Sequence, residues 1–488
     1  MNRNHPVNRR SFLKSTAALS ALAFLPAGCA TLLPEELIGA PRAKKPAVVR
    51  GAFFYPPLDV VERGECEDGW ASHEWCTWPG NQYEPEAQQA KFMGEVRRIA
   101  GGLDLSLAIN KVPIYTDAGI EAFVNGVRDS KPDALILFNF WNSFSGKLSA
   151  ILDAFDGPII VYHPVGANHQ LPPKNLETAE RVQYIHSIEN FDAIERGMRS
   201  IHAHTRMAQS RLLRVSGRLK QEADDLEAFF GMPIHGVPAD HFNDAFDQTP
   251  LTPEMERLAH AVRERATGVV DLEHKAFVDA VRSHMAVQEL MDRHDADAIT
   301  IECLFLKHRK PCLSFALNNS ALVPCGCENH LDPTVSLMLG AGLFGRGGFQ
   351  HNPEFDTEEN LYFASHCTCA TKLHGPASEE APYALRPFFH QLPKTLALDV
   401  QWPAGEGATL FKYHPGKNRL DAWGGVIEDS PGCPPTGGCA TRVLVKMNDV
   451  DDVRDVYPGP HPILYCGDFV RQAKTYADLY GLEIRCNG

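Results

Sequence analysis

Several carboxylate and imidazole side chains lie beside apolar runs in the C-terminal part of the chain. They are Glu302, Glu328, His330, His366 and His461. Carboxylates and imidazoles from separate strand ends can hold a divalent ion and leave coordination positions open for a substrate. Glu302 lies within the apolar run 298–305, where a carboxylate is costly to bury without a partner or a metal. We therefore predict a divalent metal site in this region.

The cysteines of the same region offer a second metal chemistry. Cys325 and Cys327 are two residues apart, and so are Cys367 and Cys369. Side chains at i and i+2 of a strand share one face, so these four thiols could form a zinc site. Structural zinc sites usually have Cys-x-x-Cys spacing, and free buried thiols are the alternative.

The apolar runs around these residues predict a strand-rich, barrel-like α+β domain at 296–488. The runs cover 298–305, 312–317, 395–400, 409–413, 442–446 and 463–465. Glycine and proline turns separate them, which is typical of antiparallel strands. The amphipathic segment 469–480 predicts a helix near the end of the chain.

The preceding sequence predicts two α/β domains with parallel sheets, at 46–169 and 170–295. Apolar runs such as 134–140 alternate with amphipathic segments such as 86–100 and 118–130. This alternation is typical of a Rossmann-like or flavodoxin-like sheet that helices cover on both faces.

Polar side chains follow two of the predicted N-terminal strands. Trp141 and Asn142 come after one strand, and His163 comes after another. Parallel sheets bind ligands beyond the carboxyl ends of their strands, so these three residues are candidate substrate contacts. Polar loop residues without a ligand are the alternative interpretation.

The composition excludes some partners. The chain of 488 residues is 44% hydrophobic and 22% charged, with a formal net charge of -14. This balance is ordinary for a globular protein, and the negative charge disfavours binding to phosphate backbones. We expect no nucleic-acid partner.

The N-terminal segment has the order of a twin-arginine export signal. Arg9 and Arg10 precede an uncharged stretch at 15–25. That stretch is shorter than the ~20 apolar residues that span a bilayer. We therefore predict that 1–45 is a signal peptide with its linker and that the protein is periplasmic. Cys29 follows a sequence close to a lipobox, which leaves a lipid anchor as the alternative.

Setting Cys29 aside leaves twelve of the 13 cysteines, in a chain predicted to face an oxidising compartment. Cys66 and Cys76 bracket one polar loop, and Cys433 and Cys439 bracket another. Each pair could close a local disulfide, and free thiols are the alternative.

The C-terminal motifs resemble those of the L-fucose isomerase and L-arabinose isomerase superfamily. The segment 327–330 is similar to the family's Cys/Thr-Glu-x-Asp motif. His366 with Cys367 resembles the His-Cys step of shorter relatives, and His461 between two prolines resembles the family's Asn-His-x segment. The resemblance covers about 297–488 and extends only as architecture over the earlier domains.

The resemblance implies which residues form the site. In that family an upstream glutamate, the motif aspartate and the late histidine bind a manganese-like ion, which implies Glu302, His330 and His461 as ligands here. It also implies proton transfer at the two carboxylate positions, which are Glu302 and His330 here. Our own hypothesis is that Glu302 or Glu328 takes the proton and that His366 orients the substrate or donates to a ligand, with a core histidine bonded to the backbone as the alternative for His366. His330 replaces the family's aspartate, so it can ligate or act as a base but adds no negative charge.

Together these features predict an exported enzyme that acts on a carbohydrate by metal-assisted proton transfer, as in aldose–ketose isomerisation. Manganese is the expected ion and zinc the alternative. Because His330 replaces an acid, epimerisation, elimination and glycoside cleavage stay open as alternative reactions. A sugar-binding protein that has lost catalysis is a further alternative. The resemblance also implies a homo-oligomer.

Overall fold

The computed structural model describes residues 33–39, 41–66, 83–141, 145–165, 174–388, 392–432 and 439–487. The chain divides into two compact units. The N-terminal unit contains Lys44–Arg206 and Arg471–Glu483. The C-terminal unit contains the described residues before Lys44, those of Met207–Val470, and 484–487. A helix from the C-terminal end of the chain therefore belongs to the N-terminal unit.

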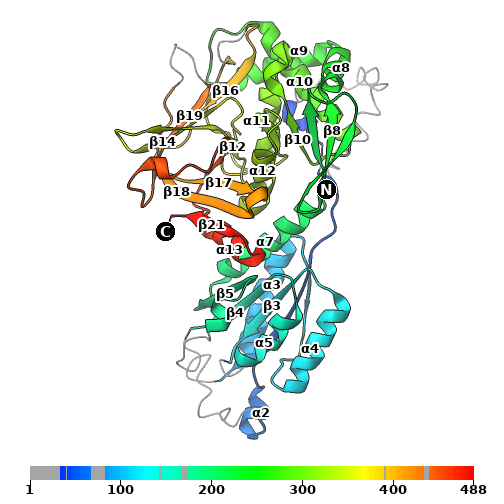
Figure 1. Cartoon of the computed structure of the whole chain (residues 1–488), viewed down its shortest axis with the longest axis vertical. Helices are drawn as coiled ribbons and strands as arrows, with labels where there is room; N and C mark the ends of the chain where they lie inside the picture. The colour runs from blue at the N-terminus through cyan, green and yellow to red at the C-terminus, as the bar shows by residue number, and fades with distance from the viewer. Residues whose placement is uncertain are drawn as a thin grey trace, which may run out of the picture. The chain divides into compact units, whose positions relative to one another are not determined.

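The N-terminal unit is a parallel sheet of order β2-β1-β3-β4-β5, with helices between its strands (Figure 1). Its elements are β1 (Val48–Phe54), α2 (Leu58–Glu62), α3 (Pro85–Gly102), β2 (Ser106–Ile109), α4 (Asp117–Ser130), β3 (Ala134–Asn139), α5 (Ser145–Ala154), β4 (Ile159–Pro164), α6 (Lys174–Glu177), β5 (Val182–Ser187), α7 (Phe191–Ala208) and α13 (Val470–Tyr480). The strand order is that of flavodoxin-like folds, which confirms the predicted parallel α/β class.

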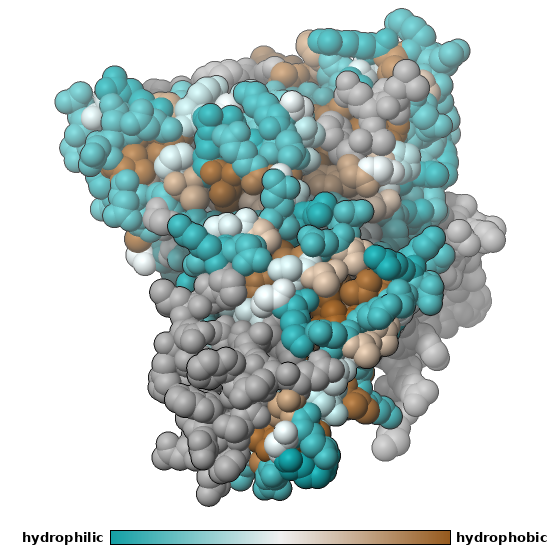
Figure 2. All heavy atoms as spheres, turned by 60° about the horizontal axis from the view of Figure 1, so that its bottom comes forward, coloured by the Kyte–Doolittle hydropathy of each residue, from teal (hydrophilic) through white to brown (hydrophobic). Residues whose placement is uncertain are grey.

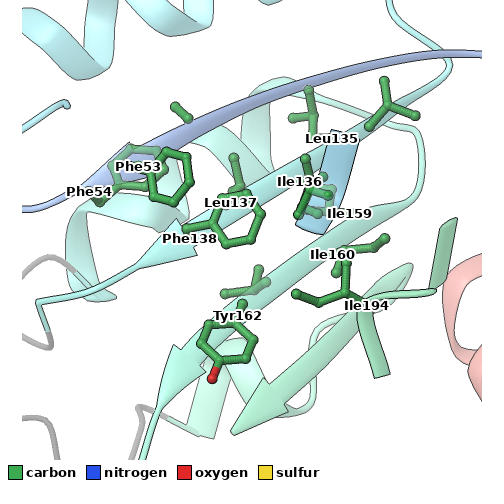
Figure 3. Packing of buried hydrophobic residues seen from close by; sticks show 14 of the residues in the cluster. Phe53, Phe54, Leu135, Ile136, Leu137, Phe138, Ile159, Ile160, Tyr162 and Ile194 are labelled. Carbon is green, nitrogen blue, oxygen red and sulfur yellow. The ribbon is translucent and has the colours of Figure 1, made fainter. Parts of the chain in front are cut away.

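The core of this unit explains why its strands have continuous apolar sequences. Every residue of β3 and β4 is buried, because helices cover both faces of the sheet. Figure 3 shows side chains of β1, β3 and β4 packed together. The ring of Phe53 stacks on Phe138 with centroids 4.4 Å apart, and Phe92 of α3 packs edge-on against Phe138.

The C-terminal unit contains a second sheet, of order β11-β10-β6-β8-β7, in which the pairings of β6, β8, β10 and β11 are parallel and β7 is antiparallel. The sheet and its helices comprise β6 (Leu212–Ser216), β7 (Ala223–Phe229), β8 (Met232–Pro238), α8 (Ala239–Gln248), α9 (Pro253–Arg265), α10 (His274–Arg293), β10 (Ala298–Ile301), α11 (Cys312–Ser320), β11 (Cys325–Cys327) and α12 (Leu331–Phe344). In the sequence, β6, β7 and β8 precede residue 295, where the second predicted α/β domain ends, and β10 and β11 follow it.

The rest of the C-terminal unit is mainly a curled antiparallel sheet of order β12-β20-β17-β18-β19-β14-β13, with β21 paired to β18. Its strands are β12 (Phe349–Gln350), β13 (Asn352–Asp356), β14 (Leu361–His366), β17 (Gly407–His414), β18 (Arg419–Asp429), β19 (Thr441–Met447), β20 (Ile463–Cys466) and β21 (Glu483–Cys486). A small sheet joins β9 (Gly268–Val269), β15 (Tyr383–Pro387) and β16 (Leu396–Val400). The 3-10 turns are η3 (Pro34–Leu37), η6 (Cys303–Phe305), η7 (Lys307–Arg309), η8 (Pro415–Lys417) and η9 (Val453–Asp455). The predicted strand-rich, barrel-like character is confirmed.

Two predicted strands differ from the structure. The run 312–317 is helical and forms α11, whose residues are all buried. Burial on every side removes the polar face by which a helix is recognised in sequence. The run 298–305 is a strand only as far as Ile301, and a 3-10 turn follows. Glu302 therefore lies at the end of a strand rather than inside it.

None of the helices in the described ranges is long and apolar enough to span a membrane. On the face drawn in Figure 2, hydrophilic residues cover much of the described surface and hydrophobic residues form small patches between them. The predicted signal segment with Arg9, Arg10 and Cys29 lies outside the described residues, as do Cys76 and Cys433. The two predicted disulfides therefore stay predictions.

Candidate metal centre

The carboxyl ends of β10 and β11 carry two glutamates in adjacent positions. The strands pair in parallel with Ile301 opposite Cys327, so Glu302 and Glu328 follow register partners. The chain after β11 then turns sharply, because Glu328 and Asn329 both have positive φ, at 63° and 55°. Such a conformation costs a non-glycine residue roughly 1–3 kcal/mol and is concentrated at functional sites. This turn sets the direction of the Glu328 side chain.

Glu328 lies between two imidazoles. Its Oε1 is 3.7 Å from Nε2 of His366, and its Oε2 is 3.6 Å from Nε2 of His461. One ligand atom from each of the three side chains lies within 4.8 Å of the others. His366 ends β14 and His461 precedes β20, so three separate segments supply the set. A carboxylate with two imidazoles suits a borderline divalent ion such as zinc or manganese.

His330 and Asn352 hold the ring of His461 from either side. Nδ1 of His330 lies 3.0 Å from Nδ1 of His461, and Oδ1 of Asn352 lies 2.9 Å from its Nε2. His461 itself has a positive φ of 54°. The predicted ligands His330 and His461 are therefore neighbours. Asn352 was not identified from the sequence, since an asparagine at the start of a strand carries no distinctive signal.

The three grouped side chains differ in their electrostatics. Burial, with the charge of His366 next, lowers the pKa of His461 to about 4, so its ring is neutral at pH 7. Burial alone would lower the pKa of His366, but hydrogen bonds with Cys327 and Glu328 raise it well above the usual value. The hydrogen bond with His366 in turn lowers the pKa of Glu328. A metal ion bound here must displace the proton of His366.

Buried thiols contact the imidazole of His366. Hydrogen bonds with Cys303 and then Cys367 lower the pKa of the Cys327 thiol well below its usual value. Sγ of Cys312 lies 3.8 Å from Sγ of Cys367. The low pKa of Cys327, together with the carboxylate of Glu328, explains how His366 can carry a proton although it is only 3% exposed.

The alternative zinc site of four thiols does not assemble. The chain leaves β14 at His366, so Cys367 and Cys369 are not on a strand with a common face. Sγ of Cys369 accepts a hydrogen bond from the indole of Trp402 at 3.3 Å. Within the described ranges, no group of potential metal ligands combines Cys325, Cys327, Cys367 and Cys369.

Glu302 does not join the cluster. Its carboxylate accepts hydrogen bonds from the hydroxyl of Ser216 at 3.0 Å and from the amide of Gly217 at 2.8 Å. These two donors, at the end of β6, supply the partners that a carboxylate at a strand end requires. None of the ligand groups found among the described residues includes Glu302.

The predicted N-terminal contacts lie at the carboxyl edge of their own sheet. Trp141 is 3% exposed and His163 is fully buried, while Asn142 lies outside the described residues. Nδ2 of Asn139 lies 3.3 Å from Nδ1 of His163. Nε1 of Trp141 and Nε2 of His163 have no hydrogen-bond partner within the described part of the chain. Burial lowers the pKa of His163 to about 4, so this edge presents neutral polar groups.

A cavity of about 480 Å³ adjoins the cluster at His330. Lys412 of β17 lines it and is only 2% exposed. Burial lowers the pKa of Lys412 to about 8. A lysine within the apolar run 409–413 is unusual for a buried strand, and this is the feature by which the sequence indicates Lys412.

Two other groups of potential metal ligands occur among the described residues. One contains Glu222, His241 and His294, and the other contains His374, Glu406 and Cys466. Each includes an exposed carboxylate, whereas Glu328 is partly buried and both of its histidines are buried. The cluster around Glu328 is therefore the strongest candidate metal centre.

Comparison with known proteins identifies the N-terminal segment. The model of the TAT (twin-arginine translocation) pathway signal sequence matches residues 6–26. This match confirms the export signal predicted from Arg9 and Arg10. No curated protein matches the chain.

Proposed function

We propose that the protein is an exported, divalent-metal-dependent enzyme that acts on a carbohydrate by metal-assisted proton transfer. The observation that carries the proposal is the convergence of Glu328, His366 and His461, whose ligand atoms lie within 4.8 Å of one another. The resemblance of the surrounding motifs to sugar isomerases supports a carbohydrate substrate. The signal sequence supports export, with the periplasm as the expected location and a lipid anchor at Cys29 as the alternative.

The ligands we assign are Glu328, His366 and His461. The donor set suits manganese, the expected ion, and also zinc. A bound divalent ion would supply Lewis acidity that polarises substrate oxygens and lowers the pKa of a neighbouring proton. Asn352 would orient the ring of His461 by accepting a hydrogen bond from its Nε2, and we therefore assign Nδ1 as the nitrogen that would bind the ion.

His330 is the residue to which we assign the proton transfer. It lines the cavity and lies beside His461. Burial, followed by the charge of Lys412, lowers the pKa of His330, so its imidazole is neutral at pH 7 and can accept a proton. A base at this position can remove a proton from one carbon of a sugar and return it to the same or an adjacent carbon. Epimerisation and isomerisation are the reactions that this movement supports.

A sugar-binding protein without catalysis is the second candidate. Two observations favour it: His330 stands where the resembling family has an acid, and Glu302 is hydrogen-bonded to Ser216 and Gly217 rather than to the cluster. Elimination or glycoside cleavage at the same site, and a homo-oligomeric state, are further parts of the proposal that rest on the resemblance.

Metal analysis tests the ligand assignment. We expect purified protein reconstituted with manganese or zinc and then dialysed to retain the ion. The variants His461→Ala, His366→Ala and Glu328→Gln should lose it, while His260→Ala, which changes an exposed histidine on α9, should keep it. Circular dichroism would show that the variants remain folded. Wild-type protein that retains neither ion would refute the proposal.

Solvent exchange tests the reaction. Metal-loaded protein in deuterium oxide should incorporate deuterium into a sugar at the carbon beside the carbonyl, detected by NMR. We expect His330→Ala to abolish the exchange while it retains the metal. Calorimetry that shows sugar binding without exchange or product across a broad sugar panel would favour the non-catalytic candidate instead.

A further inference from the structure

The cavity beside His330 has a positively charged lining. Lys412, Lys417, Arg419 and Arg485 line it, and Asp332 is the carboxylate among the lining residues. The chain as a whole has a net charge of -14, so this concentration of cations runs against its overall charge. Clefts lined by one sign of charge attract ligands of the opposite sign.

The cations of the lining are not equivalent. Arg419 is 8% exposed, and its Nε lies 3.1 Å from Oδ1 of Asp421, so its charge is largely compensated. Lys412 is buried, and its ammonium donates to the carbonyl oxygen of Pro460. Lys417 and Arg485 are exposed at the same cavity. An anion bound there would offset the cost of burying the Lys412 ammonium.

The same cavity has an aromatic and proline wall. Tyr457 is 55% exposed, and Pro458 and Pro460 line the cavity beside it. The Tyr457 ring packs edge-on against Phe355, with centroids 6.3 Å apart, which supports its position. An exposed tyrosine offers a flat apolar face with a polar tip. The C–H face of a sugar ring fits such a surface.

We propose that the cavity binds an acidic sugar, whose carboxylate or sulfate group contacts Lys412, Lys417 and Arg485 while its ring lies against Tyr457. This inference rests on the proposed function for the chemistry at His330, which lines the same cavity. The volume of about 480 Å³ lies within the usual range for small-molecule sites. Asp332 in the lining disfavours ligands with several neighbouring anionic groups, so a single charged group per sugar fits best.

Calorimetry with metal-free protein at low ionic strength tests the ligand class. The probes are D-glucuronate, D-glucose 6-sulfate, neutral D-glucose and inorganic sulfate. We expect one or both acidic sugars to bind roughly tenfold or more tightly than glucose, and to weaken as salt is added. Equal affinity for glucose and the acidic sugars would overturn the proposal. So would inorganic sulfate that binds as tightly as both acidic sugars, because the sugar ring would then contribute nothing.

Variants locate the binding. The double variant Lys417→Ala with Arg485→Ala changes two exposed side chains, so it should fold normally and lose roughly tenfold in affinity for the acidic sugar. Lys412→Met should lose at least as much. Lys220→Ala, which changes an exposed lysine away from the cavity, is the matched control. Unchanged affinity in the double variant would overturn the proposal even if Lys412→Met fails to fold.

The sugar-binding and metal-retention measurements together distinguish a failure of this inference from a failure of the metal-dependent function. Acidic-sugar binding by a protein that retains no metal would support the anion site and refute the metal centre. Metal retention without any preference for acidic sugars would refute the anion site and leave the metal centre standing.

Discussion

The two units gather polar side chains at strand ends in different ways. In the N-terminal unit, Asn139, Trp141 and His163 lie at the carboxyl edge of one parallel sheet, and they are neutral. In the C-terminal unit, Glu328 follows a strand of a parallel sheet and lies near two histidines. His366 ends a strand of the antiparallel sheet, and His461 precedes another. Both groups contain side chains at or directly after the carboxyl ends of parallel strands, where ligands commonly bind. Potential metal ligands converge where segments next to the antiparallel sheet add side chains to the end of a parallel strand.

The backbone differs between the two edges as well. Glu328, Asn329 and His461 all have positive φ. In contrast, Asn139 and His163 lie within regular strands. Positive φ also occurs elsewhere, for example at Lys131 and Glu189 of the N-terminal unit, but at the candidate metal centre three such residues belong to one site. The comparison teaches that the N-terminal edge is organised for packing and neutral contacts, and the C-terminal edge for charge.

The largest effect that we expect from this comparison is in the N-terminal core. Phe138 is fully buried and stacks on Phe53. Phe138→Ala should lower the free energy of unfolding of this unit by about 3–5 kcal/mol, because it leaves a cavity. Urea denaturation followed by circular dichroism would measure it. Loss of bound metal without loss of stability would break the distinction between the two units.

The second-largest expected effect is a loss of stability of the N-terminal unit in acid. The pKa of His163 is about 4 in the folded protein, against an ordinary value of 6.5. Between these values the unfolded chain takes up a proton that the folded protein does not, so stability falls as the pH drops from 6.5 towards 4. The free energy of unfolding should fall by about 3 kcal/mol over that range because of this one histidine. Urea denaturation at several pH values should show a shallower loss in His163→Gln, whereas His260→Gln should match the wild type.

A smaller effect concerns the support of His461. Asn352→Ala removes the side chain whose Oδ1 lies 2.9 Å from the imidazole. We expect metal affinity to fall by about 10- to 100-fold, because such partners orient metal ligands. Competition with a chelator measures this. Asn139→Ala, the corresponding change at the N-terminal edge, should leave metal affinity unchanged, and an equal loss in both variants would contradict the comparison.

The smallest expected effect tests how much a positive φ outside the candidate metal centre costs in stability. Lys131 is the C-cap residue directly after α4, with φ 45° and ψ 60°, and is exposed. Lys131→Gly should raise the free energy of unfolding by up to about 1 kcal/mol, because glycine adopts this conformation without strain. Thermal unfolding measures the gain, and Lys131→Ala should show none. A loss of stability in Lys131→Gly would show that the lysine side chain contributes at this position.

The sequence alone was sufficient for the features that depend on local pattern. The paired arginines and short apolar stretch defined the export signal, and the alternation of apolar and amphipathic segments defined the parallel N-terminal sheet. Positions beside strand ends also identified Glu328, His330, His366 and His461. These features depend on neighbouring residues, so a local reading could find them.

Tertiary structure decided which of those residues meet. Glu302 and Glu328 follow paired strands, and the turn at Glu328 and Asn329 determines that only Glu328 joins the histidines. His330 and His461 are separated by 131 positions in the sequence, but their Nδ1 atoms lie 3.0 Å apart. Asn352 contacts His461, which is distant in the sequence, and Lys412 reaches the cluster because its strand β17 pairs with β20. The helix α11 has no exposed polar face because all of its residues are buried. Such contacts depend on sheet register and long-range packing, which local periodicity does not encode.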